Sequence, residues 1–225
     1  MSFDLKPTEI RVLGVLIEKS LSQPAYYPMT LNAITAACNQ KTNRNPVVAY
    51  AEGEVSAAVA SLRRRQLVAQ ADPDRSSRAV RFKHELETRF DWNAAQRAIV
   101  AELLLRGPQT VGELRGRASR MTHLASADYA RELLVELAGA QPPIVVELPR
   151  EPGKTSRRFA HLLGGEVTVA AQASPAMTDM PTATSEAPLL ADRVLKLEEV
   201  VTNLSASLAG IRHHLRQAGL LPDDE

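Results

Sequence analysis

The stretch EGEVSAAVASLRRRQLVAQADPDRSSRAVRFKH, residues 52–84, decides the fold because its hydrophobic period changes along its length. Val55, Val59 and Leu62 recur at helical spacing, which predicts a helix with one buried face. The segments LVAQ and AVRFKH follow, separated by the turn-rich run DPDRSS, and this pattern predicts a strand, a turn and a second strand. We therefore expect a helix that leads directly into a β-hairpin.

Two further helices are expected before this stretch. The first is PTEIRVLGVLIEKSL, residues 7–21, with Pro7 in its first turn. The second is LNAITAAC, residues 31–38, with Thr30 as its N-cap. Three helices followed by a β-hairpin is the element order of a winged helix, so we predict that fold for the first part of the chain.

The same order of elements recurs downstream. Helices are predicted at NAAQRAIVAELLL and TVGELRGRA, because each begins with a capping-box spacing, Asn93 to Gln96 and Thr110 to Glu113. The helix SADYARELLVELAGA and a hairpin around Pro152-Gly153 follow. Buried positions of the two third helices match at a constant offset: Val55, Val59 and Leu62 with Ala130, Leu134 and Leu137. We therefore predict two tandem winged helices.

The predicted fold class is mainly α with small β-hairpins, that is α+β. The predicted divisions are a first winged-helix domain over residues 1–90, a second over residues 91–164, a linker over residues 165–188 and a coiled-coil helix over residues 189–218. The linker follows from composition, since residues 164–188 are rich in Ala, Pro, Ser and Thr and contain no Lys or Arg.

The last predicted helix carries a heptad pattern. Its apolar positions alternate four and three residues apart: Leu190, Val194, Leu197, Val201, Leu204, Leu208, Ile211 and Leu215. β-Branched residues at some a positions with leucine at most d positions favour a parallel dimer, so we predict a homodimer through this helix. The alternative is an amphipathic helix that packs against its own chain.

Composition bounds the compartment and the partners. A single cysteine excludes an intramolecular disulfide, and no run approaches the roughly 18 apolar residues of a membrane helix, so we expect a cytoplasmic protein without membrane contact. Residues 1–90 carry 13 Lys/Arg against 9 Asp/Glu, whereas residues 166–225 carry 4 against 9. The basic front permits contact with nucleic acid but is weaker than that of a dedicated binder.

The motifs of familiar enzyme classes are absent from the sequence. It has no phosphate-binding glycine loop, no dinucleotide fingerprint, no HExxH and no GxSxG. Cys38 is expected to be a small core residue, and His84, His123 and His161 are expected to be solvated or locally bonded. We therefore predict no catalytic residues, no metal site and no cofactor.

The cations suggest a nucleic-acid interface that does not read bases. The predicted recognition helices begin at Glu52-Gly53-Glu54 and at Ser126-Ala127-Asp128, where carboxylates would face phosphates. Phosphate contacts are instead predicted from a helix end, two hairpins and one loop: Lys41, Arg44, Arg63, Arg64, Arg75, Arg78, Arg81, Lys83, Arg150, Lys154, Arg157 and Arg158. DNA binding with a transcription-regulator-like role is one hypothesis, and a protein–protein adaptor without nucleic acid is the other.

The loop CNQKTNRNPV, residues 38–47, lies between the second and third predicted helices. Its asparagines are expected to be structural, because Asn side chains bond nearby backbone, and Asn39 is expected to take a left-handed C-cap conformation. Lys41 and Arg44 have no evident structural need at a loop tip. They are therefore the pair predicted to bind a partner.

Several stretches together resemble one bacterial family: RVLGVLIEK, YPMTLNAITAACNQKTNRNPV, LLLRGPQTVGELRGRA and HLLGGEV. They are similar to the YceH family of cytoplasmic proteins, and the similarity runs over essentially the whole chain. The resemblance implies tandem winged-helix-like domains and a function that is unassigned. It supports the fold and supplies no mechanism.

Overall fold

The computed structural model describes residues 3–72 and 79–165. The first half of this region, residues 3–90, contains three α-helices, three strands and two short 3₁₀ turns. In chain order these are α1 Pro7–Ser22, η1 Pro24–Tyr26, β1 Met29–Thr30, α2 Leu31–Cys38, α3 Glu52–Arg64, β2 Val68–Gln70, β3 Arg81–His84 and η2 Leu86–Thr88.

The second half, residues 91–165, repeats the helices and strands in the same order. Its elements are α4 Ala94–Arg106, β4 Gln109–Thr110, α5 Val111–Ala118, α6 Ala127–Gly139, β5 Val145–Glu147 and β6 Arg158–His161. All six helices begin within a residue or two of the positions predicted from the sequence. The described chain is thus a mixed α/β structure with six α-helices and two small antiparallel sheets.

Local capping explains where several helices begin. The Thr30 hydroxyl accepts a hydrogen bond from the Ala33 N–H, and the Thr110 hydroxyl accepts one from Glu113. Asn93 and Gln96 form the reciprocal capping box that their spacing predicted, with distances of 2.9 Å in both directions. Each cap satisfies an amide that the first helical turn leaves without a partner, so these starts are encoded locally.

The two sheets have equivalent topologies. The strand order is β1-β3-β2 in the first sheet and β4-β6-β5 in the second, with every neighbouring pair antiparallel. Met29 pairs with Phe82 in one sheet and Gln109 with Phe159 in the other. The hairpins were predicted, but β1 and β4 were not, because two residues carry no period that could be recognised.

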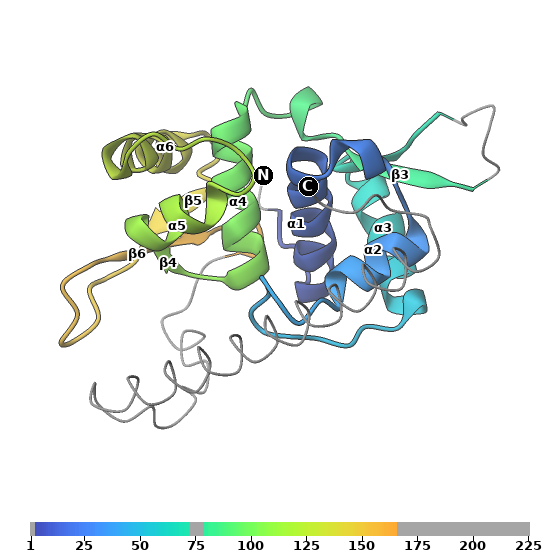
Figure 1. The fold of residues 1–225 in the computed structure, drawn as a ribbon, viewed down its shortest axis with the longest axis horizontal. Helices are drawn as coiled ribbons and strands as arrows, with labels where there is room; N and C mark the ends of the chain where they lie inside the picture. The colour runs from blue at the N-terminus through green and yellow to red at the C-terminus, as the bar shows by residue number, and fades with distance from the viewer. Residues whose placement is uncertain (1–2, 73–78, 166–225) are drawn as a thin grey trace, which may run out of the picture. The chain divides into compact units, whose positions relative to one another are not determined.

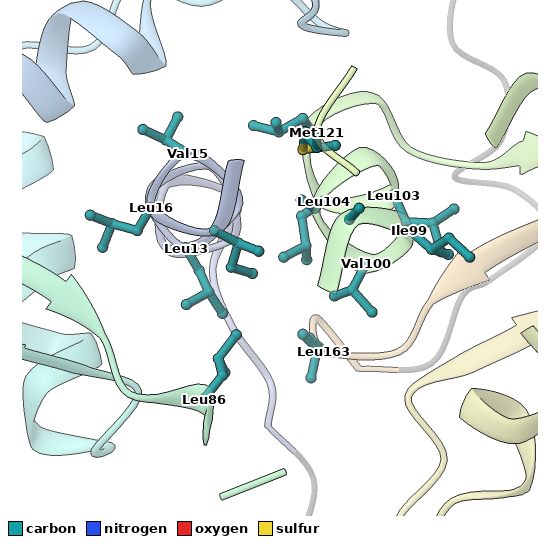
Figure 2. Close-up of a cluster of buried hydrophobic side chains, with 14 of the residues drawn as sticks. Leu13, Val15, Leu16, Leu86, Ile99, Val100, Leu103, Leu104, Met121 and Leu163 are labelled. Atoms are coloured by element: carbon teal, nitrogen blue, oxygen red, sulfur yellow. The ribbon is translucent and has the colours of Figure 1, made fainter. Parts of the chain in front are cut away.

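Two central helices join the halves into one compact unit. α1 and α4 lie side by side in Figure 1, with the remaining elements of each half on the outer sides. Figure 2 looks along both helices and shows Leu104 of α4 directed toward α1, with Leu13 and Leu16 on α1. These leucines are almost completely buried, so one apolar core runs through both halves.

Gly14 of α1 lies close against α4. A Cβ placed on this glycine would lie 3.0 Å from the Cβ of Leu104 and 3.0 Å from the side chain of Leu105. A contact that short requires the neighbour to move, so the absence of a side chain at position 14 permits the observed packing.

Several predictions concern the chain outside the described residues. The linker at 165–188 falls there apart from its first residue, as does the helix at 189–218 with its heptad residues Leu190, Val194, Leu197, Val201, Leu204, Leu208, Ile211 and Leu215. The domain boundaries therefore stay predictions. No helix in the described part of the chain is both long enough and apolar enough to cross a membrane.

Candidate nucleic-acid interface

The structure contradicts the prediction that Arg44 lies on the surface and contacts phosphate, because its side chain is buried. Its guanidinium forms a bidentate ion pair with Glu18, with Nη2–Oε2 at 2.6 Å and Nη1–Oε1 at 3.1 Å, and the two side chains are 0% and 1% exposed. Its Nε donates to the Ala37 carbonyl at the end of α2. Arg44 therefore fastens the loop to α1 and α2 and has no surface left for a phosphate.

The ion pair belongs to a network that crosses from one half to the other. Arg120, which follows α5, donates through Nη2 to Glu18 at 2.5 Å and to Glu102 of α4 at 2.7 Å. Arg106 lies 3.3 Å from the second oxygen of Glu102 and also donates to the Asn43 side chain. Three arginines therefore hold two buried carboxylates, and the network joins residues of both halves.

The electrostatics of Glu18 follow from these contacts. Burial by itself raises the pKa of Glu18, but the hydrogen bonds and charges of Arg44 and Arg120 outweigh it, so the pKa lies below its ordinary value. Glu18 is therefore ionised in the folded protein. An ionised, buried carboxylate depends on its partners, because desolvation is repaid only when hydrogen bonding is complete.

Asn39 in the 38–47 loop is structural in the way the sequence suggested, because its side chain bonds nearby backbone. Asn39 bonds Tyr50 in both directions, accepting from its N–H and donating to its carbonyl at 2.8 Å each. The Asn45 N–H donates to the Leu105 carbonyl of α4. The left-handed residue is Asn43, with φ 58°, and not Asn39, whose φ of −89° corrects the C-cap prediction.

Sequence reasoning missed Glu18, Glu102 and Arg120 because their partners lie far away in the chain. One signal was available in α4, whose segment AIVAELLL is apolar on every side and holds a single glutamate. A helix that is apolar all round is buried, and a buried carboxylate needs a cation. Glu102 is therefore expected to need a cationic partner, although the identity of that partner cannot be read from spacing.

Three predicted cations are exposed and unpaired. Within residues 3–72 and 79–165, the side chains of Lys41, Arg63 and Arg64 have no hydrogen-bond or ion-pair partner. Arg63 and Arg64 lie at the C-terminal end of α3 and line an open groove of about 810 Å³. Val68, Ala69 and Gln70 of β2 line the same groove, so the end of α3 and the first hairpin share one surface.

Two further cations of the first hairpin, Arg81 and Lys83, are engaged within the protein. Arg81 donates to the Pro28 carbonyl at 3.0 Å, and Lys83 pairs with Glu85 at 2.9 Å. The hydrogen bond and charge of Glu85 raise the pKa of Lys83. Arg75 and Arg78 lie outside the described residues.

Glutamates neutralise much of the second hairpin. Arg157 pairs with Glu147 at 3.1 Å, and Glu151 receives Lys154 at 2.8 Å and Arg158 at 3.8 Å. Arg150 donates to the Lys154 carbonyl and has no carboxylate partner within the described chain. Exposed ion pairs of this kind are weak, so these cations can exchange their glutamates for other partners. The glutamates nevertheless lower the net positive charge of this hairpin.

The helix starts that would face DNA carry acidic side chains. Glu52 and Glu54 are exposed at the beginning of α3, and Glu54 accepts a hydrogen bond from the Ala51 N–H at 2.8 Å. Asp128 is exposed at the corresponding place in α6. All three carboxylates suit the positive end of their own helix and oppose a phosphate there.

The comparison with protein families shows which family the chain belongs to. Residues 5–154 match the model described as "Protein of unknown function, DUF480". The chain belongs to this family. A UPF0502 protein of Geobacter sulfurreducens is 50% identical over 172 residues, covering 76% of this chain and 78% of the relative. UPF0502 proteins of Azoarcus sp. and Aeromonas hydrophila are each 42% identical, over 94% and 96% of this chain and 91% and 99% of their own.

The region matched by the DUF480 model contains the whole ion-pair network, since Glu18, Arg44, Glu102 and Arg120 all lie within residues 5–154. It also contains the exposed pair Arg63 and Arg64. The family description names no activity, so the arrangement of these residues must carry any functional argument.

Cysteine and histidine chemistry stays internal to the fold. Cys38 is buried, and burial raises the pKa of its thiol to about 12, which keeps it protonated. His84 and His161 have inaccessible Nδ1 atoms without a hydrogen-bond partner, and desolvation lowers each pKa to about 4. The expectation of solvated or locally bonded histidines holds in part: His84 Nε2 lies 3.0 Å from the Ser20 hydroxyl, His123 is exposed, and His161 is partly exposed. The described residues contain no cluster of three or more His, Cys, Asp or Glu side chains able to hold a metal.

Proposed function

We propose that this DUF480 chain is a non-enzymatic protein of two tandem winged helices that binds DNA through its phosphate backbone. The observation that carries the proposal is that Arg63 and Arg64 are exposed, and have no side-chain partner among the described residues, on the surface shared by α3 and the first hairpin. The element order in each half, helix–helix–helix–hairpin, is that of winged-helix DNA-binding proteins and supports the assignment.

The mode of binding we propose is independent of sequence. Glu52 and Glu54 occupy the position from which a recognition helix usually reads bases, and the outward residues Ser56, Ala57 and Ala60 are too short to reach them. Arg63 and Arg64 also complement the negative end of α3, but that role leaves their outer N–H groups free for phosphate oxygens. Affinity should therefore depend on salt more than on base sequence.

A mobility-shift titration at several salt concentrations tests this proposal. Arg63→Ala/Arg64→Ala should weaken duplex binding for all sequences alike and reduce the salt slope by about 2, because each phosphate contact contributes about 0.9. Lys154→Ala/Arg157→Ala is the matched control, since it also removes two cations but both are paired with glutamates. Wild-type protein that fails to shift DNA even at low salt would contradict the proposal.

A second candidate, a protein–protein adaptor, is favoured by the second half. Its hairpin cations are largely paired, and α6 exposes Val135 (63%) beside Arg131, Glu132 and Glu136. An isolated valine is a weak signal, yet an outer helix face of mixed charge suits a protein more than a polyanion. Pull-down from cells with and without nuclease separates the two functions, because only an adaptor keeps its partner after nuclease treatment.

We also propose that the chain is a homodimer through the predicted helix at 189–218, and that it is cytoplasmic. Light scattering of the full chain and of a form ending at Gly165 tests the first statement. Truncation should reduce the number of chains per particle from two to one, and an unchanged number of chains would indicate that the heptad residues do not associate between chains.

A further inference from the structure

A second concentration of positive charge surrounds the 38–47 loop, on residues that the DNA proposal does not use. Arg11 is buried beneath the loop and donates to the carbonyls of Cys38 and Pro46, with no carboxylate partner within the described region. Counting the buried network and its surroundings, six cations are present: Arg11, Lys19, Lys41, Arg44, Arg106 and Arg120. Among the described residues, the carboxylates that pair with these cations are Glu18 and Glu102, which leaves an excess of four positive charges in this group.

A groove of about 420 Å³ opens at this charge concentration. One wall is the last turn of α1 with Lys19 and Ser22, another is the loop with Gln40, Lys41 and Thr42, and Arg120 of the second half completes it. The volume lies within the range of small-molecule sites. The groove therefore brings together donors from both halves.

The groove presents hydrogen-bond donors, and its one carboxylate, Glu18, is already bound by arginines. Lys19 and Lys41 have no side-chain partner within residues 3–72 and 79–165, and Arg120 keeps Nη1 free while Nε and Nη2 bind Glu102 and Glu18. Both oxygens of Glu18 are held by Arg44 and Arg120. An entering anion would thus meet free cations and a carboxylate whose charge is already compensated.

The Gln40 side chain is oriented by the same network. Its Oε1 accepts from Arg44 Nη2 at 3.1 Å, which leaves the amide N–H₂ as its available group. Lys19 alone could be explained by the negative end of α1. Lys41 lies on a loop, is exposed and is unpaired, so helix electrostatics do not account for it.

We propose that this groove binds the phosphate group of a small phosphorylated molecule. A tetrahedral anion with several oxygens suits ammonium, guanidinium and amide donors that arrive from three directions, and charge-assisted hydrogen bonds of this type are the strong ones. Because the donors come from α1, the loop and Arg120, a bound phosphate would stabilise the junction of the two halves.

The proposal does not rest on DNA binding, since Arg63 and Arg64 line a different groove. Pyrophosphate is the probe, measured by calorimetry and by the shift in thermal unfolding of the full chain. Lys41→Ala should weaken pyrophosphate binding at least about tenfold, the expected loss for one charge-assisted contact. Lys6→Ala is the matched control, because it removes one exposed lysine from the opposite end of α1 and should bind as wild type does.

Four results would overturn the proposal. Wild-type protein that does not bind millimolar pyrophosphate excludes the site, and equal binding by wild type and Lys41→Ala excludes its location. Citrate that binds as tightly as pyrophosphate would exclude selectivity for phosphate. A short single-stranded oligonucleotide that displaces pyrophosphate would show that the groove takes the nucleic-acid backbone and not a small molecule.

Discussion

The two halves of the chain repeat the same helices and strands, and one difference between them is the length of a loop. Their sheets have the same strand order, and His84 and His161 occupy the same place, opposite Val68 and Val145. The connection from α2 to α3 runs over residues 39–51, whereas the connection from α5 to α6 needs only residues 119–126. Only the longer loop sends an arginine into the core.

This difference indicates what the extra residues do. The shorter loop supplies Arg120, which stays 31% exposed and reaches across to Glu18. The longer loop supplies Arg44, which is fully buried against the same carboxylate. The two halves therefore have the same arrangement of helices and strands. The extra residues of the longer loop contribute Arg44, which helps to hold the halves together.

The largest expected effect is the loss of Arg44. Arg44→Met should reduce the free energy of unfolding by about 3–5 kcal/mol, because Glu18 would be left buried with only Arg120 as a partner. Urea denaturation measures this directly. Lys41→Ala, in the same loop but exposed, should change stability by less than about 0.5 kcal/mol.

A double variant sharpens the same test. Glu18→Gln/Arg44→Met removes both charges of the pair and should recover part of the lost stability, since the orphaned carboxylate is gone. Equal destabilisation by the single and double variants would mean that Arg44 acts through packing alone.

The equivalent histidines should give the two halves the same dependence on pH. Each folded-state pKa is lowered to about 4 from an ordinary 6.5, so the unfolded chain binds more protons between these values. Stability should be complete above about pH 6.5 and fall as the pH drops toward 4, by roughly 2 kcal/mol or more for each imidazole. His84→Gln and His161→Gln should each remove about half of this slope, measured by denaturant unfolding across the range. If either variant keeps the full slope, that imidazole is not the titrating group.

The threonine caps offer a test of local equivalence. Thr30 and Thr110 have nearly identical backbone angles, with φ −74° and −75° and ψ 161° and 162°. Thr30→Ala and Thr110→Ala should each cost about 1 kcal/mol of stability. The second should cost slightly more, because the Thr110 hydroxyl also bonds Glu113. Thermal unfolding of the two variants would refute equivalence if either cap proved neutral.

The smallest effects should have opposite signs at two helical glycines. Gly14→Ala should destabilise by roughly 1 kcal/mol, because the crowding against Leu104 exceeds the gain in helix propensity. Gly53→Ala on α3 meets no atom within 4 Å and should stabilise by about 0.5–1 kcal/mol. A stabilising Gly14→Ala would show that α1 and α4 can separate slightly without loss.

The sequence predicted those features whose causes are local. Helix starts at Thr30, Asn93 and Thr110 depend on residues three positions away, and the helical and strand periods are visible within each segment. Asn39 was assigned a structural role correctly, although its conformation was not.

Features that depend on distant partners could not be predicted in the same way. Arg44 was taken for a surface residue because its partner Glu18 lies 26 positions earlier, and Arg120 lies 102 positions after Glu18. The hairpin cations were identified by type, but their neutralisation by Glu147 and Glu151 depends on the strand register. Spacing alone does not decide whether a cation is free.

The pairing of α1 with α4 has a consequence for how the chain is made. During synthesis α1 emerges first, and its face toward Leu104 has no cover until residues 94–106 have left the ribosome. Glu18 likewise waits for Arg120 to complete its partners. The nascent first half therefore exposes an apolar helix face and an incompletely paired carboxylate. Both stay exposed while about a hundred further residues are translated. A chaperone could bind the chain during this interval.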